Sequence, residues 1–247
     1  MEITKHHLQK FGEIINQYQF KTEFPEPDNW IEKTNNELWL WLVGQVIVVG
    51  SAAANDRFQN SNELRSRLKF SRLEKFPDDN QLQKEINGVL RIAGVRYASH
   101  EVEKCHKSKA LVHNFRYISN YKGGFKGMLK NLSKFNGDQA ELERVTFLMN
   151  NFKFIKSKSA RDFLMSMGMN QNTLALDIRI QNIFNHLKID FPTQAQLSKP
   201  YVYNKTEEEI ILKICKPLNL LPVKLDRILF QNYKGIIDNK SVELVNG

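Results

Sequence analysis

Apolar side chains recur three or four positions apart along most of the chain, which is the spacing of helices that bury one face. Residues 100–121 are typical, because one stripe of such a helix would carry Val102, Leu111, Val112, Phe115 and Ile118. No convincing run alternates apolar and polar residues, so the pattern predicts an all-α fold. A minor element of two or three strands at residues 95–97 or 201–203 stays open.

Start and stop signals divide the chain into helices of ordinary length. The predicted helices cover residues 4–18, 36–54, 79–94, 100–121, 138–151, 158–167, 177–187 and 222–235, and one more is opened by Thr206. The signals include the capping-box pairs Asp138/Glu141 and Thr206/Glu209, Pro222 in a first turn, and Gly94, Gly168 and Gly235 as helix stops.

Residues 38–54, LWLWLVGQVIVVGSAAA, form the most apolar stretch. A helix that crosses a bilayer needs ~20 apolar residues and usually has basic anchors at its ends. This stretch is shorter, contains Gln45 and two glycines, and ends in small residues. We therefore expect the buried central helix of a globular domain and no membrane partner. A basic membrane-associated protein is an alternative that depends on this stretch alone.

The chain has 247 residues, of which 41% are apolar, so it can bury a substantial core. No repeat or long linker interrupts it, and residues 1–247 are expected to form one unit. Its 36 basic and 27 acidic side chains give a formal charge of +9, which favours an anionic partner such as nucleic acid. Several of the cations gather at residues 57–75, where a phosphate-binding surface and an ordinary solvated face are equal alternatives.

The cysteines and the first residues limit the metal chemistry and the compartment. Cys105 and Cys215 lack the spacing of metal ligands, so we expect no metal site and two thiols in a reducing environment. The segment from Met1 to His7 lacks the apolar core of a signal peptide. An intracellular protein of the cytoplasm, nucleoid or nucleus is expected.

Residues 152–184, FKFIKSKSARDFLMSMGMNQNTLALDIRIQNIF, carry the most specific pattern. A lysine opens a helix, an alanine and an apolar turn follow, a glycine ends the helix, and an aspartate comes nineteen positions after the lysine. The residues in these places are Lys158, Ala160, Phe163, Leu164, Gly168 and Asp177. Two other stretches accompany them, namely Gly94-Val95-Arg96-Tyr97 followed by Lys109-Ala110, and residues 210–237, which end in LDRILFQNYKGII.

In order and spacing, these stretches resemble the helix-hairpin-helix DNA glycosylase superfamily, especially the archaeal-type 8-oxoguanine DNA glycosylase/AP lyases. The resemblance covers roughly residues 35–238. It implies two helical lobes around a central cleft that is lined by Lys158 and Asp177, and a basic face that holds double-stranded DNA. It also implies that a monomer without a cofactor excises a damaged base, with an oxidised purine such as 8-oxoguanine as the first guess.

The residue types suit this reaction on chemical grounds. A neutral lysine amine can attack the anomeric carbon of deoxyribose and form a Schiff base, which permits elimination of the 3′ phosphate. A helix N-terminus and the nearby cations Lys153 and Lys156 would favour the neutral form of such an amine at Lys158. Asp177, as a carboxylate, would orient the nucleophile and stabilise the positive charge that develops on the sugar.

The hairpin between the two helices departs from the family. Relatives carry a glycine-rich LPGIG-type turn there, whose backbone N–H groups bind a DNA phosphate, whereas this chain has Phe152-Lys153-Phe154-Ile155-Lys156. A close approach of the backbone would need glycine. The side chains of Lys153 and Lys156 are therefore expected to bind the phosphate instead.

The residues for base recognition depart as well. Asn55, in the loop expected after the buried helix, is the candidate to fill the gap that an extruded base leaves. Phe230 stands where relatives have a tryptophan in the last helix. Phe230 and Trp39 are the candidates for stacking on the base.

Two simpler interpretations stay open beside this one. Lys158 also fits a solvated surface lysine, and Asp177 fits an ordinary helix cap. With the hairpin glycines missing, the alternative function is a catalytically inactive helix-hairpin-helix protein that binds nucleic acid.

Overall fold

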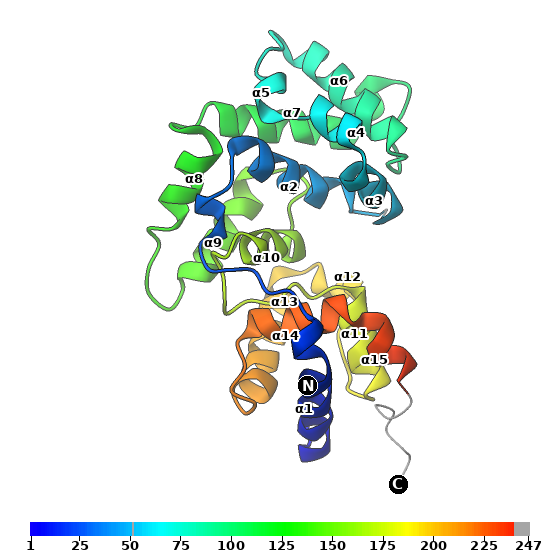
Figure 1. Ribbon diagram of the computed structural model, residues 1–247, viewed down its shortest axis with the longest axis vertical. Helices are drawn as coiled ribbons and strands as arrows, with labels where there is room; N and C mark the ends of the chain where they lie inside the picture. Colours follow the sequence, from blue (N-terminus) through cyan, green and yellow to red (C-terminus); the bar gives the residue numbers. More distant parts are fainter. Residues whose placement is uncertain (51, 240–247) are drawn as a thin grey trace. The chain divides into compact units, whose positions relative to one another are not determined.

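The computed structural model describes residues 1–50 and 52–239 (Figure 1). All regular elements in this part of the chain are helical, so the predicted all-α class is confirmed. Residues 95–97 lie in and beside a turn and residues 201–203 lie inside a helix, so neither of these two segments is a strand. No helix in the described ranges is long and apolar enough to span a membrane.

The chain divides into two compact units. The internal unit is Asp28–Phe163, and the terminal unit combines Met1–Pro27 with Leu164–Gly247. The internal unit contains η2 (Asn29–Ile31), α2 (Asn35–Ile47), α3 (Ala52–Asn60), α4 (Asn62–Arg67), α5 (Phe70–Leu73), α6 (Asp79–Ile92), η3 (Val102–Lys104), α7 (His106–Ser119), α8 (Gly124–Leu132) and α9 (Ala140–Asn151). The boundary between the units falls within α10 (Ser157–Ser166).

Helix α2 forms the centre of the internal unit and packs against α3, α5, α7 and α8. Its start is a capping box in which Thr34 and Glu37 satisfy each other's backbone N–H groups. Trp39 is fully buried, and its ring meets those of Phe70 and Phe115 at centroid distances of 6.2 and 5.5 Å. Aromatic burial of this kind dominates the energy of a core.

One long helix over residues 36–54 was predicted, and this was wrong. Helix α2 ends at Ile47 and α3 begins at Ala52, with Gly50 at a φ of +80° and residue 51 outside the described residues. The buried ammonium of Lys107 donates to the carbonyl oxygens of Ile47 and Val49, which satisfies acceptors that the end of a helix leaves open. Burial lowers the pKa of Lys107.

The terminal unit contains α1 (Lys5–Tyr18), η1 (Gln19–Lys21), α11 (Ile178–His186), α12 (Gln194–Leu197), α13 (Pro200–Ile210), the π-helical turn η4 (Ile211–Cys215), α14 (Pro222–Gln231) and α15 (Tyr233–Asp238). Helix α11 packs against α14 and α15, and α1 packs against α14. One continuous apolar cluster joins α1, α11, α13 and α14. The N-terminal residues therefore belong to the same core as the last helices.

Several predicted helix boundaries are confirmed. Pro222 occupies the first turn of α14. Gly94 and Gly168 have φ values of +72° and +68°, as residues just after a helix often do. Helix α10 agrees with the predicted residues 158–167 within about one residue at either end. The N–H of Gly168 donates to the carbonyl of Met165 and closes the last turn of the helix.

Four other boundaries were wrong. Helix α7 begins at His106 rather than His100, after the 3₁₀ turn η3. Thr206 lies inside α13, which Pro200 opens, and Asp138 precedes an α9 that begins at Ala140 without a side-chain cap. Gly235 lies inside α15 and does not stop a helix. A Cβ there would lie 2.9 Å from the hydroxyl of Tyr18, so a close approach of α1 explains the glycine.

Candidate active site

The hairpin between α9 and α10 has a left-handed residue at its centre, because Phe154 has a φ of +62°. Glycine takes this conformation far more easily than phenylalanine does. The amide of Asn114, buried on α7, stabilises the turn from one side. It donates from Nδ2 to the carbonyl of Lys153 at 3.0 Å and accepts the N–H of Lys153 at 2.7 Å. A glycine-like turn thus forms here without glycine.

Lys153 and Lys156 are exposed at this hairpin. Neither side chain makes an ion pair within the described residues. The backbone N–H of Lys156 donates to Oγ of Ser159 at 2.9 Å, which caps the start of α10. The two ammonium groups therefore face solvent, where an anion can reach them, and their role in binding DNA stays a prediction.

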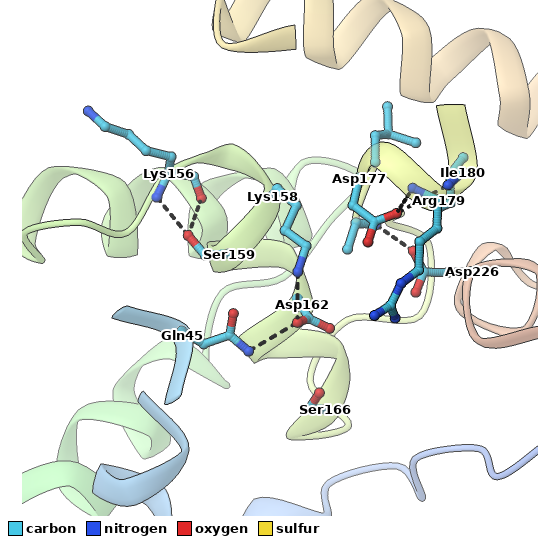
Figure 2. Close-up of polar contacts among 12 residues, drawn as sticks. Gln45, Lys156, Lys158, Ser159, Asp162, Ser166, Asp177, Arg179, Ile180 and Asp226 are labelled. Carbon is cyan, nitrogen blue, oxygen red and sulfur yellow. Dashed lines mark hydrogen bonds and ion pairs between the residues drawn. The ribbon is translucent and has the colours of Figure 1, made fainter. Parts of the chain in front are cut away.

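Lys158 lies in the first turn of α10, as predicted. Its Nζ lies 3.2 Å from Oδ2 of Asp162, one turn further along the helix (Figure 2). The same oxygen accepts a hydrogen bond of 3.0 Å from Nε2 of Gln45 on α2. The side chains of Lys158 and Asp162 are 30% and 13% exposed, so the amine is reachable from solvent whereas its carboxylate partner is largely covered.

Neither Asp162 nor Gln45 was predicted as a site residue. The spacing of Lys158 and Asp162, four positions apart on a predicted helix, is a recognised signal for a side-chain pair and could have found the aspartate. Gln45 lies 117 positions away from Asp162 in the chain, and no local signal connects the two.

Asp177 caps α11, as its predicted place at a helix start implied. Its Oδ1 accepts the N–H groups of Arg179 and Ile180 at 2.9 and 3.1 Å (Figure 2). The side chain is half-buried. A carboxylate in this position satisfies two backbone N–H groups at the start of the helix and interacts favourably with the N-terminal end of the helix dipole.

The segment just before Asp177 is held by buried side chains rather than by secondary structure. The N–H groups of three consecutive residues, 174 to 176, donate to Glu207, Asp226 and Tyr203 at 2.7, 2.6 and 2.7 Å. The Tyr203 hydroxyl in turn donates to the carbonyl of Leu174 at 2.9 Å. Glu207 and Tyr203 come from α13 and Asp226 from α14. These three residues were not predicted as part of the site.

Trp39 is 0% exposed and belongs to the core of the internal unit. A side chain that no solvent reaches cannot stack on a DNA base, so its assignment as a base-recognition candidate was wrong. Phe230 is half-buried, and the guanidinium of Arg179 lies 4.2 Å from the centre of its ring. A cation over the ring is a favourable contact and covers part of the surface that a base would use.

Asn55 lies on α3 rather than in a loop. Its Oδ1 accepts a long hydrogen bond of 3.5 Å from Nε2 of Gln59. A Cβ on Gly44 would lie 3.2 Å from the same oxygen, so Asn55 packs closely on α2. The side chain is half-buried, and a role in filling a gap in DNA stays a prediction.

The basic stretch at residues 57–75 has partners within the protein. Arg67 makes a two-pronged pair with Glu85 at 2.9 and 3.0 Å, and Arg72 reaches the same carboxylate at 3.3 Å. The hydrogen bond from Arg67 lowers the pKa of Glu85. Arg57 donates to the carbonyl of Ala93 at 2.8 Å. These contacts favour a structural role for three of the cations over a phosphate-binding one.

Comparison with known proteins identifies the fold. No family model and no curated protein matches the chain. Among solved structures, the 8-oxoguanine DNA glycosylase of Methanocaldococcus jannaschii is 19% identical with a TM-score of 0.67, covering 94% of this chain and 96% of that one. The same enzyme in complex with a 15-mer DNA that contains 8-oxoguanine is 18% identical with a TM-score of 0.63, covering 92% and 97%.

The 8-oxoguanine DNA glycosylase of Thermotoga maritima is similar too, with 22% identity, a TM-score of 0.60, and 94% and 97% of the two chains covered. A likeness over nearly the whole length of each chain shows a common fold. The chain therefore has the fold of the helix-hairpin-helix 8-oxoguanine DNA glycosylases, as its sequence pattern predicted. The helix-hairpin-helix itself consists of α9, residues 152–156 and α10.

Proposed function

We propose that this protein is a DNA glycosylase with AP lyase activity, in which Lys158 is the nucleophile and Asp177 the carboxylate that assists it. The observation that carries the proposal is a half-exposed lysine in the first turn of the second hairpin helix, within this fold. A half-buried aspartate at the start of another helix, nineteen positions after the lysine, supports it. Fold alone does not imply activity, so the proposal depends on these two side chains.

In the proposed reaction, the neutral amine of Lys158 forms a bond to C1′ of the nucleotide. The bond from C1′ to the base breaks, and the base leaves with the bonding electrons and takes up a proton. A proton then moves from Nζ to O4′ as the bond from C1′ to O4′ breaks, which opens the sugar ring and gives a protonated Schiff base. Removal of a proton from C2′ then expels the 3′ phosphate, and water releases the enzyme. Asp177 would stabilise the cationic sugar during the first step.

The proposed substrate is a damaged base in double-stranded DNA, and an oxidised purine such as 8-oxoguanine is the first candidate. The structural relatives are named for that base, and one of them is in complex with DNA that contains it. The base must leave the helical stack before the amine can reach C1′. We propose that the protein acts as a monomer, inside the cell, and that Lys153 and Lys156 bind the DNA backbone while Asn55 and Phe230 contact the displaced or remaining base.

Borohydride trapping tests this function. Duplex DNA with 8-oxoguanine opposite cytosine, and the same duplex with an abasic site, are incubated with the protein and sodium borohydride. Reduction of a Schiff base leaves a covalent protein–DNA adduct that is visible on a denaturing gel. We expect adducts with both duplexes and none with undamaged DNA. The absence of any adduct would contradict the proposal.

The second candidate function is a catalytically inactive protein that binds DNA with the same scaffold. The hairpin sequence favours it, because it departs from the glycine-rich turn of the family that the chain resembles. Such a protein would retain salt-dependent binding to DNA and give no adduct with an abasic duplex. The trapping experiment therefore distinguishes the two functions.

A further inference from the structure

The amine of Lys158 lies at the end of a flexible side chain, and something must direct it if it is to attack one carbon atom. The carboxylate of Asp162 is in contact with it at 3.2 Å, on the same face of α10 (Figure 2). A reacting group gains most of its effectiveness from being held in the productive geometry. The contact to Asp162 is the one ion pair that Lys158 makes within the described residues.

Gln45, on α2, contacts the same oxygen of the carboxylate. A carboxylate only accepts hydrogen bonds, so the contact of 3.0 Å between Oδ2 of Asp162 and Gln45 requires that the NH₂ end of the amide face it. Gln45 is 8% exposed, and its Oε1 is buried without a hydrogen-bond partner in the described residues. One carboxylate oxygen thus accepts from two donors, which come from α2 and α10.

Stability alone does not explain this arrangement. An ion pair between a lysine and an aspartate four positions apart, with the lysine open to solvent, contributes little to a helix. A buried amide oxygen without a donor is unfavourable for folding. An apolar side chain at position 45 would avoid that penalty, so the amide makes sense where the orientation of Asp162 matters.

We infer that Asp162 is a positioning residue for the nucleophile and that Gln45 fixes the position of Asp162. Gln45 holds Asp162, and Asp162 directs the amine of Lys158. This role rests on the proposed function of Lys158. Because Asp162 acts through Lys158, its removal affects the rate of Schiff-base formation and leaves the affinity for DNA unchanged.

The first test measures the ion pair and does not depend on activity. The protein is labelled with the amine reagent trinitrobenzenesulfonate, and the modification of each lysine is followed by peptide mass spectrometry. In Asp162→Ala, Lys158 should be labelled up to about fivefold faster, because the carboxylate no longer holds the amine in a contact that competes with the reagent. The matched control is Glu13→Ala, which removes a pair of 3.1 Å between Lys10 and Glu13 in α1 and should leave Lys158 unchanged. Equal labelling of Lys158 in the parent and in Asp162→Ala would overturn the inference.

The second test measures positioning by single-turnover trapping on an abasic duplex. Asp162→Ala should slow adduct formation about ten- to a hundredfold, the scale of a misplaced reacting group, with the dissociation constant for DNA within twofold of the parent. Asp162→Asn should restore most of the rate. Its amide oxygen can take the place of Oδ2 and accept from both Lys158 and Gln45.

The outcomes separate the inference from the function on which it rests. Trapping at the parental rate in Asp162→Ala, or an Asp162→Asn as slow as Asp162→Ala, overturns positioning while the proposed function stands. A parent protein that forms no adduct overturns the proposed function and the positioning role with it. A slow Asp162→Ala, an active Asp162→Asn and unchanged affinity together support the inference.

Discussion

The two candidate catalytic side chains are held in different ways. Lys158 is directed by a carboxylate four positions along its own helix, with one amide from α2 behind it. Asp177 follows a segment whose backbone is bound by buried groups of α13 and α14, 27 to 51 positions away in the chain. The lysine therefore depends on a few exchangeable side-chain contacts, whereas the aspartate depends on the packing of a whole unit. Substitutions near Lys158 should change rates, and substitutions behind Asp177 should change stability.

The largest expected effect is on trapping in Lys158→Gln. Glutamine has no nucleophilic amine, so no Schiff base can form at this position, and the adduct with borohydride should disappear. The affinity for duplex DNA should stay within about a factor of ten, because a single charge near the backbone contributes modestly to binding. Undiminished trapping would assign the nucleophile to another lysine, with Lys156 the first to examine.

The next effect, on Asp177→Asn, separates catalysis from capping. Asparagine is a good helix cap, so the free energy of unfolding should change by a few tenths to about 1 kcal/mol. The loss of the negative charge should slow base excision at least about a hundredfold, as removal of a positioned electrostatic group does in other active sites. Thermal unfolding and single-turnover excision measure the two quantities. An Asp177→Asn protein that melts normally and excises at the parental rate would show that Asp177 only caps α11.

The same contrast explains which parts of the site the sequence predicts. Lys158 and Asp177 lie at helix starts, and helix starts have local signals, so both positions could be found. Glu207, Asp226 and Tyr203 could not, because each acts on a backbone far away in the chain and lies on a helix that looks ordinary. A buried acidic residue on an apolar face is visible in a sequence only as an exception to the pattern.

The errors in the predicted fold have the same origin. The predicted helix over residues 36–54 is broken where Lys107, some sixty positions away, satisfies the end of α2. The largely apolar composition of that stretch hides the break. Similarly, Phe154 has a left-handed backbone although glycine is expected there, because the amide of Asn114 stabilises the turn. Local propensity is a weak guide where a distant side chain satisfies the backbone.

A smaller effect, on stability, tests the hydrogen bonds that hold residues 174–176 before Asp177. Tyr203→Phe removes the hydroxyl that accepts the N–H of Leu176 and donates to the carbonyl of Leu174. Because the N–H is buried, its loss of a partner should lower the free energy of unfolding by about 1–3 kcal/mol. Tyr201→Phe is a matched control, since this tyrosine is 76% exposed on the same helix and should unfold like the parent. Equal denaturation midpoints for the two variants would show that the Tyr203 hydroxyl does not stabilise this segment.

The smallest effect is on the salt dependence of DNA binding and concerns how the hairpin binds the phosphates. Two mechanisms are physically open. The lysine side chains can bind the phosphates as point charges, or the left-handed turn at Phe154 can present backbone N–H groups as a glycine-rich turn does. Only the first mechanism is removed when both lysines, Lys153 and Lys156, are changed to alanine. The salt dependence of DNA affinity distinguishes the two, because each lost phosphate contact lowers the slope by about 0.9.

We expect the double variant of the hairpin to bind all sequences more weakly, with a slope lower by up to about two units. The control removes two exposed lysines of the terminal unit, Lys205 and Lys216, so that the net charge falls equally. This control should keep the parental slope within about half a unit, because lysines that do not contact a phosphate displace no counterion from the DNA. Equal slopes for the hairpin variant and the parent would exclude the lysine side chains. The turn at Phe154 would then be the phosphate contact. The hairpin would in that case resemble the segment before Asp177, because the backbone of both is held by side chains that are distant in the chain.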